Sequence, residues 1–466
     1  MKKDINQVFT AQLYMEDKPI DVKLYRGTKY SVLITFQKKN LFKNETFFKK
    51  LSIDFNDTKY EIPHCLFILD RGEHDQYDGS LIFPENLHDF DFLFFNDRIV
   101  DLTTLSNDRE LLMQQKEEIK ESFKTYTANL TYDIELFRQF FNELDNQLER
   151  EPNYVKRTAV TTLLTTEGEK FIAYLKDQQK LLEKEISGFT RAEHVSHGYY
   201  FRTQIRHIID QSEILKRTND KPRGYIGDSE MMNMIYAGGY IGDSSFSKLL
   251  YKYSIDHEGA QAVRNRRAVI SKQVKQIYQD KNKKEKTNLR VMSVACGPFR
   301  ESEDFFSDSY DLIGSEFVLL DQDELAIKDA RDTIRSVEKK IGLRLSVEFI
   351  QDSIRTFISD KDLDKRIGKF DFIYSMGLFD YLTTLVGRIV MKKLFSLLKP
   401  GGIILVGNYH YKNPSRFYME YWHDWVLYYR DENDFKQLLK GLDVKDFNIS
   451  FENSKSQMFL TAHKGT

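Results

Sequence analysis

The stretch LRVMSVACGP, residues 289–298, decides the fold of this 466-residue chain. It begins as a short apolar run of strand character and ends in a turn of small residues, Ala295-Cys296-Gly297-Pro298. A buried parallel strand that ends in small residues lets the backbone pass close to a ligand, and the following helix begins there with free N–H groups. The pattern therefore predicts the first strand of a doubly wound α/β sheet, with a ligand crevice at its carboxyl edge.

The next two strands of this sheet are predicted to end in acidic residues. EFVLLDQD, residues 316–323, predicts a strand that ends in Asp321, and the strand Leu345–Ile350 is followed by Asp352 and Ser353. A carboxylate in the first position is suited to accept both hydroxyls of a ribose, and one in the second to bind an adenine amino group. The alternative is a plain doubly wound domain in which both acids only cap helices.

Further segments complete the predicted sheet. They are a helix at Glu324–Val337, a strand at Phe370–Ser375, a helix at Thr384–Leu398, a strand at Ile403–Gly407, and a terminal antiparallel pair at Phe447–Phe451 and Gln457–Ala462. The second helix is expected to stop at Lys-Pro-Gly-Gly. The position of this stop, together with the two strand-end acids, favours a nucleoside-binding sheet over the plain one.

Residues 1–105 are predicted to form a small β domain. Short β-branched or aromatic runs are separated by turn formers such as Lys38–Asn40 and Asn56–Asp57, and they lie at Val22–Tyr25, Tyr30–Phe36, Phe47–Phe55 and Cys65–Leu69. Regular spacing of short strands is typical of a small antiparallel barrel or sandwich. We interpret it as a structural or docking module, with a PilZ-type cyclic-dinucleotide receptor as the alternative. No Arg-x-x-x-Arg phosphate loop supports that alternative.

Residues 106–219 show helical periodicity and are predicted to form a helical linker bundle. Apolar residues recur at helical spacing from about Asn107, and further helices are expected at Val160–Ile186 and His194–Leu215. Residues 220–288 are predicted to cap the α/β domain. They repeat Tyr-Ile-Gly-Asp at 225–228 and 240–243, where each Gly-Asp pair is expected to turn the chain and cap a helix, and one amphipathic helix follows over residues 257–281.

Composition narrows the function classes. The net charge of −2 and the pI near 6.6 provide no basic field for nucleic acid. Cys65 and Cys296 form no metal or redox pattern. His194 and His197, with Glu193, resemble a partial metal site, but their spacing provides no clear third ligand, so we expect no metal. No apolar run approaches the roughly 18–20 residues that span a bilayer. We expect a cytoplasmic protein; the oligomeric state, a homodimer included, stays open.

The motifs VMSVACGP, FVLLDQD, FIQDSI, FDFIYSMGLFDYL and LLKPGGIILVGN resemble those of the class I S-adenosylmethionine (SAM)-dependent methyltransferases over about Arg290–Lys464. The resemblance implies a Rossmann-like catalytic domain at 220–466 with SAM as cofactor. Its implied cofactor-binding residues are Ala295, Cys296, Gly297, Glu301, Asp321, Gln322, Asp352, Ser353, Ser375 and Met376. The chain departs from the family pattern at Ser293, Ala295 and Phe299, and at Phe299 the turn is expected to open differently.

Flanking segments are similar to a narrower bacterial group, the extracellular factor 3-hydroxypalmitic acid methyl ester biosynthesis proteins. The similarity rests on EHVSHGYYFRTQI, KPRGYIGDSEMMNMIY, AQAVRNRR and NYHYKNPSRFYMEYWHDWVLYYRDENDF, between about Glu193 and Phe435. It implies methylation of the carboxyl group of a hydroxylated fatty acid to a quorum-sensing methyl ester. A carboxylate acceptor is already ionised at neutral pH, so this reaction needs no general base.

Several residues are candidates for work on the acceptor. For catalysis we assign His410 and Tyr225; for substrate binding we assign Arg223, Asp228, Met231, Asn408, Arg416 and Tyr418. Met231, Met232, Met234, Ile235 and Tyr236 are candidate walls of an apolar tunnel, because methionine adapts to flexible ligands. The competing interpretation makes the methionines ordinary core, the arginines structural ion-pair partners and His410 a satisfied histidine.

Three functions stay open at this point. The first is a methyltransferase for a fatty-acid-like small molecule. The second is an N- or O-methyltransferase of a protein or polar metabolite. The third is a non-catalytic SAM-sensing protein, which the altered glycine turn keeps in view.

Overall fold

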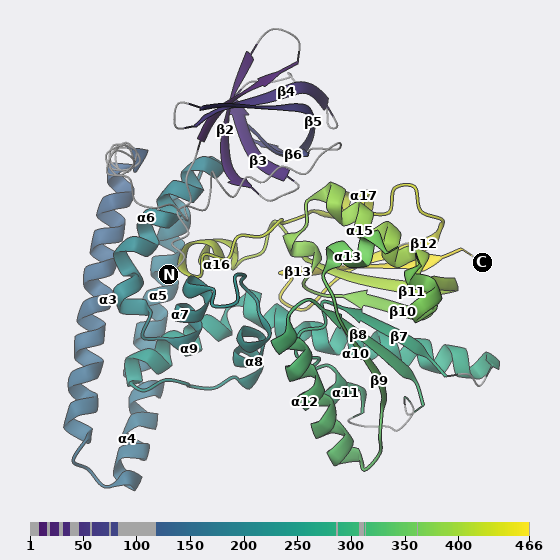
Figure 1. Ribbon diagram of the computed structural model, residues 1–466. Coiled ribbons are helices and arrows are strands. Elements are labelled where there is room, and N and C mark those ends of the chain that lie inside the picture. Colours follow the sequence, from purple (N-terminus) through teal and green to yellow (C-terminus); the bar gives the residue numbers. More distant parts are fainter. Residues whose placement is uncertain are drawn as a thin grey trace. The chain divides into compact units, whose positions relative to one another are not determined.

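The computed structural model (Figure 1) describes residues 9–15, 19–27, 31–37, 46–55, 58–73, 76–82, 118–285, 288–306, 312, 314–360 and 362–465. The predicted turns at Lys38–Asn40 and Asn56–Asp57, and the start of the helical region near Asn107, lie outside these residues. By their contacts the residues form two compact units, 1–134 with 176–205 and 135–175 with 206–466.

The first unit contains a closed antiparallel barrel. Its strands are β1 (Phe9–Tyr14), β2 (Pro19–Gly27), β3 (Ser31–Gln37), β4 (Thr46–Phe55), β5 (Thr58–Glu73) and β6 (Gln76–Ile82), in the order β1-β2-β3-β6-β5-β4, with β4 paired back to β1. Alternate residues such as Leu51 and Ile53 point into a fully buried interior. The sequence left a barrel and a sandwich open, and the structure has the barrel.

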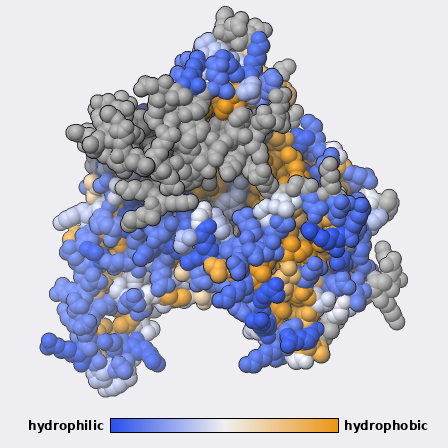
Figure 2. Space-filling view, viewed as in Figure 1, coloured by the Kyte–Doolittle hydropathy of each residue, from blue (hydrophilic) through white to orange (hydrophobic). Residues whose placement is uncertain are grey.

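The helical region consists of more helices than predicted. They are α3 (Glu121–Leu148), α4 (Asn153–Thr165), α5 (Glu167–Glu185), α6 (Arg191–Ile209) and α7 (Glu213–Asp220). The single helix expected at Val160–Ile186 is broken at Thr166, whose backbone leaves the helical region. The helix expected at His194–Leu215 is broken at Ser212, which is extended and precedes α7. The visible faces of α3 and α4 are mostly hydrophilic (Figure 2), as expected for solvent-facing helices.

The second unit is built on a seven-stranded sheet in the order β12-β13-β11-β10-β7-β8-β9. The strands are β7 (Arg290–Val294), β8 (Glu316–Asp321), β9 (Ser346–Gln351), β10 (Phe370–Ser375), β11 (Leu398–Tyr409), β12 (Val444–Phe451) and β13 (Gln457–Lys464). Strands β7 to β11 are parallel, and β13 is antiparallel to both of its neighbours. The chain runs outward from β7 to β9 and then crosses back to β10. This change of direction places a switch point at the carboxyl ends of β7 and β10.

Helices cover both faces of this sheet, which confirms the doubly wound fold (Figure 1). One face packs against α10 (Glu258–Glu285), α11 (Ser302–Phe305) and α12 (Glu324–Ile341); the other packs against α13 (Ile354–Ser359), α14 (Leu363–Ile367), α15 (Thr384–Ser396) and α17 (Glu432–Gln437). Within β7, Val291 joins the first cluster while Met292 and Val294 join the second. A strand that is apolar on both faces is the sequence pattern that a fully covered parallel strand requires.

Two local predictions need correction. Helix α15 ends at Ser396, and the Lys-Pro-Gly-Gly segment is not its stop but the irregular start of β11. Gly402 is needed there because a Cβ atom would lie 2.9 Å from the Lys399 carbonyl oxygen. Asp243 does not cap a helix, because Ser244 forms the capping box of α9 (Ser245–Asp256).

Among the residues that the structure describes, no helix is long and apolar enough to cross a membrane.

Residues 220–288, called the cap segment below, depend on Asp228 for their stability. This residue is 2% exposed, accepts a 2.8 Å hydrogen bond from the Met231 amide at the start of α8 (Ser229–Ala237), and pairs with Arg217. We expect Asp228→Ala to lower the free energy of unfolding by about 3–5 kcal/mol, because it leaves a partly buried guanidinium unpaired and the helix uncapped. Denaturant unfolding of the full chain measures this. Asp256→Ala removes an exposed ion pair with Lys252 and should cost less than about 1 kcal/mol; equal losses would contradict the account.

Candidate active site

The turn after β7 adopts an unusual backbone. Ala295, Gly297 and Phe299 have φ angles of 54°, 54° and 52°, so three alternate residues take the left-handed conformation that glycine favours. The prediction that the turn opens differently at Phe299 is wrong, because Phe299 keeps the left-handed conformation that a glycine would adopt there. The Phe299 ring is buried and packs edge-on against Phe305 and Phe317. At Gly297 a Cβ atom would meet nothing within 4 Å, so the backbone there borders open space.

The Asp321 carboxylate joins this turn to the end of β8. One oxygen accepts a 2.9 Å hydrogen bond from the Gly297 amide and the other a 3.1 Å bond from the Asp323 amide. The side chain is 8% exposed, and burial raises the pKa of its carboxyl above the usual range despite these bonds. The Asp321 carbonyl also accepts the Asp352 amide at 3.0 Å, which connects the ends of β8 and β9.

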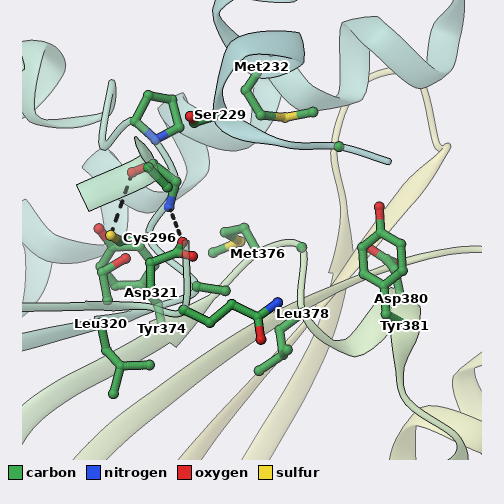
Figure 3. Close-up of a pocket in the computed structure, with 18 of the residues that line it drawn as sticks. Ser229, Met232, Cys296, Leu320, Asp321, Tyr374, Met376, Leu378, Asp380 and Tyr381 are labelled. Atoms are coloured by element: carbon green, nitrogen blue, oxygen red, sulfur yellow. Dashed lines mark hydrogen bonds between the residues drawn. The ribbon is translucent and has the colours of Figure 1, made fainter. Parts of the chain in front are cut away.

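These strand ends surround a cavity of about 350 Å³, within the range of small-molecule sites. Figure 3 shows part of its lining. Of the predicted site residues, those that line it are Tyr225, Ala295, Cys296, Gly297, Glu301, Asp321, Gln322, Asp352 and Met376. Apolar walls come from Met232, Ile270, Leu320, Ile354, Leu378, Leu382 and Trp425. The anchored carboxylate, the open space at Gly297 and the second acid at the end of β9 fit a nucleoside-bearing ligand.

Glu301 is a second buried acid of the cavity. It is 7% exposed and accepts a 2.7 Å hydrogen bond from the Tyr374 hydroxyl. Burial raises the pKa of the Glu301 carboxyl. Tyr374 comes from β10, so this bond ties the residues after β7 to the neighbouring strand and fixes where the carboxylate points.

Two predicted cofactor residues lie outside the cavity lining. The Ser375 hydroxyl donates to the Val294 carbonyl at 2.8 Å, which joins β10 to β7. Ser353 caps α13 by accepting the Thr356 amide at 3.1 Å. Both side chains position the backbone beside the cavity.

Predicted acceptor residues of the cap segment are engaged in structural pairs. Arg223 donates at 2.8 Å to Asp323, which also accepts the Tyr225 hydroxyl at 2.8 Å. Asp228 caps α8 and pairs with Arg217. Met231 is 2% exposed and belongs to an apolar core cluster, whereas its neighbour Met232 lines the cavity. Arg223, Asp228 and Met231 themselves lie outside the cavity lining.

The remaining predicted acceptor residues also lie away from the cavity. The Asn408 amide donates to the Tyr409 and Tyr428 carbonyls. The His410 ring packs against Phe451 and lies 3.5 Å from the Glu432 carboxylate. Arg416 pairs with Glu420 at 2.9 Å, and the buried Tyr418 hydroxyl bonds Ser254. Arg416 matches the structural alternative that the sequence left open for the arginines. His410 does not, because its Nδ1 atom accepts the Lys412 amide but its buried Nε2 atom has no hydrogen-bond partner among the described residues.

The cap segment forms one wall of the cavity through two anchors. Tyr225 and Arg223 hold one end at Asp323, beside the end of β8. At the next residue the Tyr381 hydroxyl donates to the Ile226 carbonyl at 2.7 Å and accepts from Trp425 at 3.0 Å. Gly227 directly follows the second anchor with a φ of 79°, and a Cβ atom there would lie 2.8 Å from the Tyr381 oxygen.

Sequence reasoning missed two charged residues of the cavity, Arg266 and Asp380. Arg266 lies on α10 in register with Val263 and Ile270, so a basic residue on the apolar stripe was the available signal. Its guanidinium reaches the Met376 carbonyl at 3.4 Å and the Met232 sulfur at 3.3 Å. Asp380 follows β10, is 2% exposed and accepts the Tyr409 amide at 2.7 Å. Its burial depends on tertiary packing and left no signal in the sequence.

No metal site accompanies these groups within the described part of the chain, where no three His, Cys, Asp or Glu side chains are arranged to hold an ion. The His197 ring faces the Glu193 carbonyl at 2.8 Å and the Lys120 amide at 3.1 Å.

The buried carboxyl of Asp380 should make the stability of the folded chain depend on pH. Burial raises the pKa of this carboxyl to about 7, from 3.8 in a solvated chain. The folded state therefore binds a proton that the unfolded state releases near pH 4, so stability from this group falls as the pH rises towards 7. We expect Asp380→Asn to remove about 2–3 kcal/mol of this loss between pH 5 and pH 8. Thermal unfolding of both proteins at the two pH values tests it; a stability difference that is the same at both would contradict it.

Comparison with known proteins gives a family match within the second unit of the chain. Residues 285–449 match the family model of a methyltransferase domain. No curated protein matches the chain.

Solved structures similar to the chain have low sequence identity. A possible exported protein from Bordetella parapertussis is 13% identical with a TM-score of 0.40, over 65% of this chain and 97% of that one. The magnesium protoporphyrin IX methyltransferase ChlM from Synechocystis PCC 6803, with bound SAH, is 12% identical with a TM-score of 0.33, over 44% and 85%. The N-methyltransferase NodS from Bradyrhizobium japonicum is 11% identical with a TM-score of 0.29, over 43% and 96%.

The matched residues contain all eight predicted site residues from Ala295 to Met376 that line the cavity. The domain match and the cavity together identify this chain as a SAM-dependent methyltransferase, with S-adenosylmethionine as its cofactor.

Proposed function

We propose that this methyltransferase acts on a small molecule with an apolar body, and that it converts the carboxylate of a hydroxylated fatty acid to a methyl ester. The proposal is supported by the resemblance of residues 193–435 to methyl ester biosynthesis proteins and by the lining of the cavity. A quorum-sensing role for the ester comes from that resemblance alone.

In this proposal the carboxylates on one side of the cavity hold the cofactor. Asp321 accepts the ribose hydroxyls, Asp352 the adenine amino group, and Glu301 lies with the methionine ammonium. When bound, SAM supplies an electrophilic methyl group on its sulfonium. The chain contributes position, because in-line transfer depends on holding donor and nucleophile within about 3–3.5 Å of each other.

The observation that carries the acceptor assignment is the cation Arg266, which forms no ion pair with the described residues of the cavity lining. Of the residues that line the cavity in the described part of the chain, it is the one lysine, arginine or histidine. Its hydrogen-bond partners are neutral: the Met376 carbonyl, the Met232 sulfur and the Tyr236 hydroxyl. The carboxyl groups of Glu301 and Asp380 lie close enough for its charge to act on them, but neither forms a hydrogen bond with it. A guanidinium whose hydrogen-bond partners are neutral is suited to hold a carboxylate. Met232, Leu378 and Leu382 provide apolar surface for the attached chain.

A second candidate is N- or O-methylation of a polar metabolite or protein. It is favoured by the acidic lining, because Glu301, Asp321, Asp352 and Asp380 outnumber Arg266 and would also suit a cationic or protic acceptor. Product analysis separates the two candidates.

The first test is the product itself. Purified protein is incubated with methyl-labelled SAM and a series of hydroxylated fatty acids, and lipid extracts are analysed by mass spectrometry. We expect a labelled methyl ester, and a drop in kcat/KM of at least about 100-fold in Arg266→Gln, which removes the group that holds the carboxylate. Labelled water-soluble metabolites without any ester would favour the second candidate.

The second test concerns the cofactor. We expect Asp321→Ala to weaken SAM binding by at least tenfold in calorimetric titration, because the variant loses the ribose acceptor and the tie to Gly297. Asp332→Ala, an exposed α12 carboxylate paired with Arg335, is the matched control and should bind SAM like the parent. Unchanged affinity in Asp321→Ala would exclude this residue as the ribose ligand.

A further inference from the structure

Asp380 is a buried acid of the cavity that the proposed cofactor contacts leave unused. It belongs to the short 3-10 helix η1 (Phe379–Tyr381) and is 2% exposed. One carboxylate oxygen accepts the Tyr409 amide at 2.7 Å. Among the residues that the structure describes, the other oxygen has no hydrogen-bond donor, and the side chain lines the cavity. A carboxylate oxygen that faces a cavity without a donor gains free energy from a ligand that supplies one.

The strand order places Asp380 away from the cofactor carboxylates. Asp321 and Asp352 follow β8 and β9, on one side of β7. Asp380 follows β10 and is bonded to the last residue of β11, on the other side of β7. In Figure 3, Met376 lies between Asp321 and the pair formed by Asp380 and Tyr381. A nucleoside over β8 and β9 therefore leaves Asp380 for the group that lies beyond the methionine end.

The loop that carries Asp380 is held rigidly. The buried Arg430 guanidinium donates to the carbonyls of Phe379 and Leu382, which flank Asp380, and to the Asn408 side-chain oxygen. The Asp380 carbonyl accepts the Tyr428 amide at 2.8 Å. A side chain fixed on both sides of its backbone is prepared to bind a ligand without reorganisation.

The cavity has more carboxylates than SAM has groups of hydrogen-bond donors, which leaves one carboxylate for the methyl acceptor. SAM offers three donor groups: the ammonium, the ribose hydroxyls and the adenine amino group. The cavity offers four carboxylates, and Glu301, Asp321 and Asp352 lie on the side of the turn and of β8 and β9. The fourth, Asp380, lies on the side left for the methyl acceptor, which can supply a donor to its free oxygen.

We propose that Asp380 is the acceptor-recognition residue, whose free carboxylate oxygen accepts a hydrogen bond from an O–H group on the methyl acceptor. This deepens the proposed function, on which it rests. Arg266 holds the carboxylate that is methylated, and Asp380 selects acids that carry a hydroxyl near it. A site built to bond a hydroxyl rejects the analogue that lacks it, because its buried polar group is then left unpaired.

The test compares two acceptors that differ only in this hydroxyl. The value of kcat/KM is measured for a 3-hydroxy fatty acid and for the unsubstituted acid of the same length. We expect the parent protein to prefer the hydroxy acid by at least tenfold, Asp380→Ala to reduce this preference to below about threefold, and Asp380→Asn, which keeps an acceptor oxygen, to restore part of it. Calorimetric binding of both acids to the complex with S-adenosylhomocysteine gives the same ratio without turnover.

Asp371→Asn is the matched control. Asp371 is a partly buried carboxylate of β10, but it bonds Lys281 and Lys399 and lies outside the cavity lining. This variant should lose stability and keep the preference. Equal use of both acids by the parent protein, or a preference that survives Asp380→Ala, overturns the assignment of Asp380 while the ester-forming function stands. If neither acid is bound or methylated, the proposed function fails with it.

Discussion

The two hydrogen bonds to the Asp321 carboxylate determine the geometry of the whole site. They fix the left-handed turn after β7 and the start of the loop after β8 against one buried acid. The Asp352 amide then bonds the Asp321 carbonyl, and Tyr374 bonds Glu301 just beyond the turn. Each neighbouring strand end is positioned relative to this carboxylate. Backbone strain at Ala295 and Phe299 is tolerated because these bonds and the packing of the Phe299 ring hold the turn.

The cap segment extends the same principle to the opposite wall of the cavity. Arg223 and Tyr225 bond Asp323, two residues after Asp321. The residues first assigned to the acceptor thus hold the wall that encloses it. The surface left for ligands is apolar, with charged groups at few points, and this combination suits a molecule with a polar head and an apolar body.

The sequence was sufficient to predict the sheet and its strand ends. Residues on both faces of β7 are apolar, and acids stand at the ends of strands, so Asp321 and Asp352 could be placed on one edge. The partners of Arg223 and His410 could not be predicted, because they depend on how distant segments pack: Arg223 meets Asp323 100 residues away. At His410 the strand end was right, but its ring packs beside Phe451. Asp380 was invisible for a similar reason, since only the folded loop buries it.

In the proposed site, three of the four cavity carboxylates bind the cofactor, and the fourth, Asp380, binds the methyl acceptor. A crystal structure of the chain with S-adenosylhomocysteine tests this assignment most directly. The account predicts ribose hydroxyls bonded to Asp321, the adenine beside Asp352, and a distance between Asp380 and the amino group of the bound molecule too long for a hydrogen bond. Contact between Asp380 and that amino group, or a ribose away from Asp321, would contradict it.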